Sequence, residues 1–103
     1  NVMGVAKAAL ETSVKYLSVD LGDQDVRVNA ISAGPMRTLA GAAIANARDV
    51  FNYTSENSSL KRKVNLDELG NSALYLVSDL SSAITGEIHY VDCGFNIIGM
   101  PKS

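Results

Sequence analysis

The chain has 103 residues and a formal net charge of −2, and 47 % of its residues are hydrophobic, which is the composition of one globular domain rather than of a disordered chain. This charge gives no general attraction to nucleic acid or to an anionic membrane, and no apolar run approaches the roughly 20 residues of a membrane span. A single cysteine excludes an internal disulfide and, beside a single histidine, argues against a metal site, so a reducing, cytoplasmic setting is the simplest expectation.

The first predicted element is a long helix from Asn1 to Leu21, with Gly22 as its C-cap. Lys7 lies in the half of this helix that is rich in small residues, and from periodicity alone it is an ordinary surface lysine. Residues at three- and four-residue steps predict one buried stripe along the helix: Val2, Met3, Ala6, Ala9, Leu10, Ser13, Val14, Leu17 and Leu21.

A short buried strand is predicted next, beginning at Val26, because β-branched and apolar residues recur at Val26, Val28, Ala30 and Ile31. Gly34 and Pro35 end it, since proline has no N–H to give to a ladder. Residues 36–38 (Met-Arg-Thr) then supply a cation and a hydroxyl. Open α/β sheets bind ligands in the crevice beyond the carboxyl ends of their strands, so this exit is the candidate binding edge.

The middle of the chain carries weaker signals. Helical spacing without a strong cap predicts a loosely held helix from Leu39 to Phe51. The polar run from Asn52 to Ser59 is interpreted as loop or frayed helix end. The basic run at residues 61–63 is too short for a nucleic-acid arm and is interpreted as a solvated loop face.

A second well-marked helix is predicted from Leu66 to Leu80. Asn65 is its expected N-cap, and Glu68 completes a variant of the capping box. Ser81 and Ser82 break the helix. Its expected apolar stripe consists of Leu66, Leu69, Ala73, Leu76, Val77 and Leu80.

The last predicted element is a strand from Glu87 to Asp92, where apolar and polar residues alternate. A helix between two strands implies a right-handed parallel crossover, so the fold class is α/β. Two strands cannot make a doubly wound sheet, so the missing strands are expected to come from sequence before Asn1 or from other chains, and the former is simpler.

Three stretches together carry a resemblance to a known family: the strand exit N-A-I-S-A-G-P-M-R-T, the helix L-G-N-S-A-L-Y-L-V-S-D-L and the closing I-T-G-E-I-H-Y-V-D-C-G-F. With Lys7 ahead of them, the chain resembles the C-terminal part of a short-chain dehydrogenase/reductase. More narrowly, it is similar to the NADH-dependent enoyl-[acyl-carrier-protein] reductases of bacterial fatty-acid synthesis. The most specific piece is S-A-G-P-M-R-T-L-A.

The resemblance implies that residues 1–103 are the C-terminal part of a single NAD(P)-binding Rossmann domain whose N-terminal half is absent from the chain. It implies reduction of the 2,3-double bond of an enoyl thioester bound to acyl carrier protein, with NADH as the cofactor. It also implies a homotetramer with no nucleic-acid or membrane partner.

The resemblance assigns site residues as well. In these reductases a tyrosine, a methionine and a lysine lie along one helix, and Met3 and Lys7 match the second and third of them. The tyrosine would directly precede Asn1, so the chain alone is expected to be inactive. Lys7 is implied to be catalytic and to bind the nicotinamide ribose, and no metal is implied. The other implied cofactor residues are Ala33, Pro35, Met36 and Thr38, and the implied substrate residues are Met3 together with Ala40 and Ile44 in a mobile substrate-binding segment.

Other interpretations remain open. Thr38 is a simple helix cap in one of them, residues 39–51 form an ordinary surface helix in another, and Cys93 is interpreted as a packed thiol at a strand end. For the whole protein, the rivals are a ketoreductase of the same fold and a non-catalytic interaction module. Met3 and the G-P-M-R-T sequence favour the enoyl reductase over the ketoreductase. The sequence that precedes Asn1 would discriminate the enzyme from the module.

Overall fold

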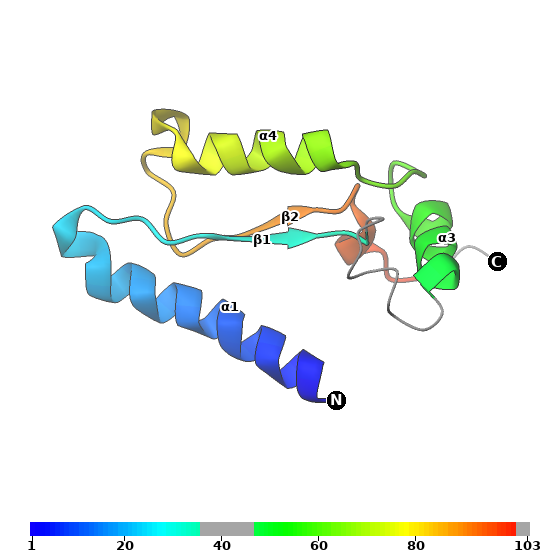
Figure 1. Cartoon of the computed structure of the whole chain (residues 1–103), viewed down its shortest axis with the longest axis horizontal. Coiled ribbons are helices and arrows are strands. Elements are labelled where there is room, and N and C mark those ends of the chain that lie inside the picture. Colours follow the sequence, from blue (N-terminus) through cyan, green and yellow to red (C-terminus); the bar gives the residue numbers. More distant parts are fainter. Residues whose placement is uncertain (36–46, 101–103) are drawn as a thin grey trace. The chain divides into compact units, whose positions relative to one another are not determined.

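The computed structural model describes residues 1–35 and 47–100, and Figure 1 shows its elements along the chain. Its contacts divide the chain into two compact units, one of Asn1–Ile31 with Leu74–His89 and one of Ser32–Ala73 with Tyr90–Ser103. The helices are α1 (Val2–Leu21), α3 (Ala47–Asn57) and α4 (Leu66–Val77), the strands are β1 (Ala30–Ala33) and β2 (Ile88–Val91), and short 3₁₀ turns span Gly22–Gln24, Asp79–Ser81 and Phe95–Ile97.

Helix α1 confirms the first predicted element almost to the residue. Asn1 is its N-cap, and the side-chain oxygen of Asn1 accepts a hydrogen bond of 3.1 Å from the backbone N–H of Gly4. Gly22 is the C-cap, but its backbone is right-handed, with φ −62° and ψ −36°. The left-handed turn comes later, at Asp25 with φ 60°, because a 3₁₀ turn extends the helix first.

Strands β1 and β2 form a two-stranded parallel sheet, which confirms the expected α/β class. The N–H of Ala30 donates to the carbonyl of Glu87 at 2.9 Å, and the N–H of Gly34 donates to the carbonyl of Val91 at 3.0 Å. Both bonds join residues separated by the same interval, so the strands run in the same direction.

The predicted start of the first strand was wrong, because pairing begins at Ala30 and not at Val26, whereas its end directly before Gly34 and Pro35 is as predicted. Before Ala30 the backbone forms other hydrogen bonds. The N–H of Val26 donates to the carbonyl of Leu21, and the N–H of Val28 donates to the hydroxyl of Thr85. The carbonyl of Val28 also accepts from the N–H of Gly86 at 2.7 Å, so Val28 is bonded to the segment that leads into β2, although it precedes the paired residues of β1.

Helix α3 corrects the prediction for the polar run, because residues 52–57 are helical. The amide of Asn57 donates to the carbonyl of Tyr53 at 2.9 Å, and the hydroxyl of Ser55 donates to the carbonyl of Asn52 at 3.1 Å. The ring of Tyr53 also meets that of Phe95 edge to face, with centroids 6.1 Å apart. Polar side chains that bond back to their own helix are compatible with helical structure. Residues 39–46 of the weak helix predicted here lie outside the described residues.

Helix α4 begins at Leu66 as predicted and ends at Val77, three residues before the predicted end. A 3₁₀ turn follows, and its last residue, Ser81, is buried. The guanidinium of Arg27 donates to the Ser81 hydroxyl at 3.0 Å and to the carbonyls of Ser78 and Ile84. A cation that donates hydrogen bonds to carbonyls just past a helix end satisfies carbonyls that lack a helical partner, and it interacts favourably with the helix dipole there.

The expected apolar stripes are largely uncovered. Of the stripe on α1 only Val14 is buried, and Val2 is 86 % exposed. On α4, Leu76 is buried while Val77 is 79 % exposed. Within the described residues the stripe on α1 is covered only at Val14, as is expected if the rest of the sheet lies outside this chain.

Candidate functional site

Helix α1 carries two of the implied site residues. Met3 and Lys7 are four residues apart on the helix, so their side chains share one face. Met3 is 65 % exposed and Lys7 is also exposed. Among the described residues no hydrogen bond or ion pair occupies the Lys7 ammonium, whose three donors are free for a ligand.

The carboxyl end of β1 carries two more. Ala33 is the exposed last residue of the strand, and Pro35 is half-buried just beyond it. Between them the backbone of Gly34 approaches Asp92 so closely that a Cβ on Gly34 would lie 3.2 Å from the Asp92 Cα. A larger residue at position 34 would press against the neighbouring strand exit, so glycine permits the close approach at this edge.

The exit of β2 is a tightly bonded turn. The carboxylate of Asp92 accepts hydrogen bonds from the backbone N–H of Gly94 at 3.0 Å and from that of Asn96 at 2.9 Å. Cys93 and Gly94 both have left-handed backbones, with φ 56° and 83°. The Cys93 side chain is half-buried. The Asp92 carboxylate is thus engaged in shaping this turn.

A second turn, directly after α3, rests on the first. The N–H of Leu60 donates to the carbonyl of Cys93 at 3.1 Å, and the hydroxyl of Ser59 donates to the carbonyl of Gly94 at 3.3 Å. A Cβ on Gly94 would lie 2.6 Å from the Ser59 oxygen. These contacts place the end of α3 against the exit of β2.

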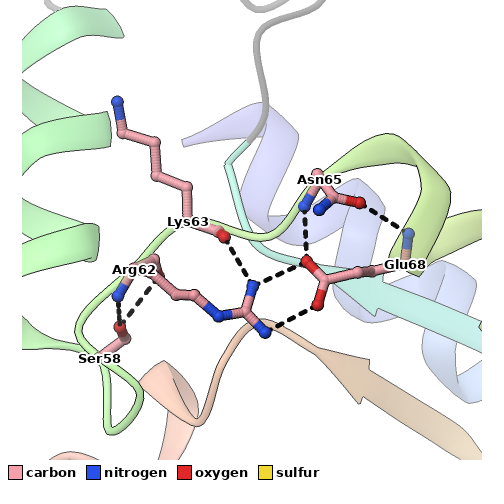
Figure 2. A network of polar contacts seen from close by, with 5 residues as sticks. All are labelled: Ser58, Arg62, Lys63, Asn65 and Glu68. Carbon is pink, nitrogen blue, oxygen red and sulfur yellow. Dashed lines mark hydrogen bonds and ion pairs between the residues drawn. The ribbon is translucent and has the colours of Figure 1, made fainter.

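Arg62 joins the same turn to α4 (Figure 2). Its guanidinium donates to both carboxylate oxygens of Glu68, at 2.8 and 2.7 Å, and also to the carbonyl of Lys63. The fully buried hydroxyl of Ser58 accepts from the Arg62 N–H and donates to the Arg62 carbonyl. The residue is therefore held through both its side chain and its backbone.

Glu68 closes the network and confirms the predicted capping box. Its carboxylate accepts from the N–H of Asn65 at 3.1 Å, and the Asn65 side chain accepts from the N–H of Glu68 at 2.8 Å. The hydrogen bond from Arg62 is the main cause that lowers the pKa of Glu68, and the Asn65 N–H lowers it further. The same carboxylate hydrogen bond raises the pKa of Arg62.

The sequence predicted the capping box of this network but not the ion pair of Arg62 with Glu68. Lys61 is exposed, as a solvated loop face predicts, but Arg62 is committed to Glu68. Lys63 points away from that pair in Figure 2, and its ammonium lies 5.7 Å from the centre of the Phe51 ring. The one available signal was an opposite charge six residues after Arg62 in a capping position.

Comparisons with known proteins identify the family of the chain. A family model described as enoyl-(acyl carrier protein) reductase matches residues 1–96. The chain belongs to the enoyl-[acyl-carrier-protein] reductase family. The resemblance drawn from the sequence is confirmed, and so is the assignment to a Rossmann-type α/β fold.

Relatives agree along the whole chain. An enoyl-[acyl-carrier-protein] reductase [NADH] 2 of Rhizobium meliloti is 62 % identical over 101 residues, which are 98 % of this chain and 38 % of that protein. A counterpart named FabI from Rickettsia typhi is 55 % identical over 99 % of this chain and 39 % of its own length. The chain therefore spans about two fifths of the length of these relatives.

Solved structures of the family agree as well. The crystal structure of FabI from Candidatus Liberibacter asiaticus matches with a TM-score of 0.94 at 62 % identity, covering 99 % of this chain and 40 % of that one. A reductase from Anaplasma phagocytophilum, solved in complex with NAD, matches with a TM-score of 0.92 at 55 % identity, covering 100 % of this chain and 39 % of that one.

Of the implied site residues, the structure places Met3 and Lys7 on one face of α1, and it places Ala33 and Pro35 at the carboxyl end of β1. The other implied site residues, Met36, Thr38, Ala40 and Ile44, lie outside the described residues. Over residues 1–35 and 47–100, no three His, Cys, Asp or Glu side chains gather as a metal site would require. None of the helices in those ranges combines the length and apolarity of a membrane span.

Proposed function

We propose that the whole protein reduces the 2,3-double bond of an enoyl thioester bound to acyl carrier protein, as part of fatty-acid synthesis, with NADH as the reductant. The observation that carries this proposal is the 62 % identity to a reductase of that name along 98 % of the chain. The shared helix face of Met3 and Lys7 supports it further. On this proposal the present chain contributes one part of the active site and is inactive alone.

The side chains present fit a nicotinamide cofactor. NADH supplies the hydride when it is bound. The exposed ammonium of Lys7 would hold the nicotinamide ribose by donating hydrogen bonds to its hydroxyls, and its positive charge would favour ionisation of a phenol nearby. On this proposal Pro35 and Met36 would border the nicotinamide, Thr38 would reach the pyrophosphate, and Ala33 would belong to the same cofactor-binding set.

Met3 lies on the substrate side of the same helix face, one turn before Lys7, and Ala40 and Ile44 line the acyl pocket on this proposal. The group that stabilises the developing enolate is a tyrosine one turn before Met3 in the whole protein. A hydrogen bond from its hydroxyl to the thioester carbonyl supplies the electrostatic stabilisation that usually dominates such catalysis.

Assaying the whole protein with crotonyl and acetoacetyl thioesters tests this proposal. We expect NADH oxidation with the crotonyl substrate and none with the acetoacetyl substrate. Turnover of the keto substrate alone would identify a ketoreductase instead. A protein that neither turns over a substrate nor binds NADH would favour a non-catalytic interaction module. The variant Lys7→Met is expected to weaken NADH binding by about 10-fold or more, as loss of a charged hydrogen-bond donor implies.

We also propose that the whole protein is a cytoplasmic homotetramer. In this family the first long helix and the closing strand commonly build two-fold interfaces, and the exposed apolar residues of α1 agree with such a role. Light scattering of the whole protein is expected to give the mass of four copies. A monomer at micromolar concentration would contradict the assembly without affecting the proposed chemistry.

A further inference from the structure

The turn after α3 contacts two elements that are far apart in the sequence. On one side Arg62 holds Glu68 in the first turn of α4 through two short hydrogen bonds. On the other side Leu60 and Ser59 bond to the carbonyls of Cys93 and Gly94 at the exit of β2. The turn is therefore a link between the start of α4 and the carboxyl edge of the sheet.

The link continues to the strand exit on which the cofactor residues lie. Asp92, one residue before Cys93, stands against the backbone of Gly34, where a Cβ would come within 3.2 Å. The N–H of Gly34 is bonded to the carbonyl of Val91 at 3.0 Å. Because no space separates these backbones, a shift of the β2 exit displaces Gly34 and Pro35 as well.

We propose that Arg62 is a positioning residue for the cofactor edge: paired with Glu68, it fixes the turn that supports Cys93 and Gly94 and thereby holds Gly34 and Pro35 in place for the nicotinamide. This inference rests on the proposed function, because Pro35 borders a nicotinamide only there. Arg62 itself contacts no cofactor in this scheme and acts through the turn. The bidentate geometry suits the task, since two parallel hydrogen bonds fix orientation as well as distance.

The arrangement distinguishes a positioning role from a purely stabilising one. The side chains of Arg62 and Glu68 are 48 % and 33 % exposed, and exposed ion pairs contribute little to overall stability. The buried hydroxyl of Ser58 bonds to the backbone of Arg62 and not to its side chain, so we expect this contact to persist when the side chain is changed. We therefore expect removal of the ion pair to alter the site more than it alters folding.

The test uses the whole protein and titrates NADH by fluorescence or calorimetry, so that the readout does not depend on turnover. Two variants remove the pair: Arg62→Gln, and Glu68→Gln, which retains an oxygen for the Asn65 N–H and so preserves the cap. Each is expected to raise the Kd for NADH by about 3- to 10-fold, in the range of couplings carried by packed networks. The Kd for NADH of the double variant is expected to be no higher than that of the single variant with the higher Kd, since each single change already removes the ion pair. At saturating NADH and thioester, kcat is expected to stay within about twofold.

A matched control is Arg48→Gln, because Arg48 is exposed on α3 and has no hydrogen bond or ion pair among the described residues. It is expected to leave the Kd for NADH unchanged. Arg62→Lys keeps the charge but not the fork, so it is expected to fall between wild type and Arg62→Gln. If Arg62→Gln does not fold, Arg62→Lys and Glu68→Gln provide the same measurement of the Kd for NADH.

An unchanged Kd for NADH in the folded pair variants would overturn the positioning role, whether or not their thermal stability falls. Additive losses in the double variant would overturn it too, because the two residues would then act separately. A failure of the proposed function is distinguishable, since the wild-type protein would then neither bind NADH nor reduce an enoyl thioester.

Discussion

At the scale of single residues, two glycines with opposite surroundings give a matched comparison. Gly94 has φ 83°, and a Cβ there would lie 2.6 Å from the Ser59 oxygen and 2.7 Å from the Ser59 Cβ. Gly22 has φ −62° and ψ −36°, and no described atom would lie within 4 Å of a Cβ. The first glycine is required by conformation and space, whereas the second is not.

We expect Gly94→Ala to lower the free energy of unfolding of the whole protein by about 1–3 kcal/mol, from backbone strain and the clash together. Gly22→Ala is expected to raise it by about 0.4–1 kcal/mol, because alanine restricts the unfolded chain and accepts helical angles. Denaturant unfolding of both variants measures this difference. Two shifts of the same sign would contradict the conformations described for these glycines.

The ion pair of Arg62 with Glu68 gives a prediction about pH. The pKa of Glu68 is lowered below its ordinary value of 4.5 in the folded chain, so the pair stabilises the fold fully above that value. This contribution is lost as the pH falls through the lowered pKa. Arg62, whose pKa is raised by the same hydrogen bond, stays charged throughout.

We therefore expect the difference in Tm between wild type and Glu68→Gln to be constant between about pH 6 and 8 and to shrink below the ordinary carboxyl range. The measurement is a thermal scan at low ionic strength, where an exposed pair is least screened. Glu56→Gln on α3 is the control, because no ion pair engages Glu56 among the described residues. A difference that grows on acidification would show that another interaction of Glu68 dominates.

At the scale of elements, local signals were sufficient where local interactions decide. The capping box of Asn65 and Glu68 could be predicted because both partners lie within one turn. The start of β1 could not be predicted, since the partner carbonyl of Ala30 belongs to Glu87, more than fifty residues later. Residues 52–57 were interpreted as loop or frayed helix end, and they are helical because their polar side chains bond back to helix carbonyls, which composition does not reveal.

The candidate site divides in the same way. Met3 and Lys7 share a helix face for reasons of spacing alone, so predicting the helix was enough to place them together, whereas their roles were implied only by the family resemblance. The supporting contacts of Arg62 and the docking of Ser59 on Gly94 could not be predicted, because they join segments that meet only in the folded chain. Site residues on regular elements are thus easier to predict than the turns that hold them in place.

Helix α4 provides the prediction at this scale. Replacing Asn65 with alanine removes the oxygen that accepts the Glu68 N–H, and the loss of such a cap costs about 0.5–2 kcal/mol of stability. Asn71→Ala is the matched control, because Asn71 is exposed inside the same helix and alanine is the better helix former. Denaturant unfolding of the whole protein is expected to show a loss for Asn65→Ala only. Equal losses would mean that the capping box does not stabilise α4.

At the scale of the whole molecule, the exposed apolar residues and the extent of the family match point the same way. Only Val14, Val64 and Leu76 are buried hydrophobic residues in the described part of the chain. Large apolar side chains on α1 and α4 remain exposed, and the chain spans 38 % of the Rhizobium meliloti relative. A core this small supplies little of the apolar burial, worth about 25 cal/mol per Å², that stabilises a domain.

We therefore expect residues 1–103, expressed alone, to be molten or aggregated and to bind no NADH. A dinucleotide site needs backbone donors for the pyrophosphate, which a doubly wound fold takes from its first βαβ unit, and the described residues contain a single parallel strand pair. Uncovered strand edges and apolar helix faces also favour association between copies. Thermal scanning and calorimetric titration with NADH, with the whole protein measured in parallel, test both expectations. A cooperative transition together with micromolar NADH binding by the isolated chain would mean that the contacts around Gly34 and Arg62 suffice for the cofactor, and the division of the site between this chain and the rest of the protein would have to be abandoned.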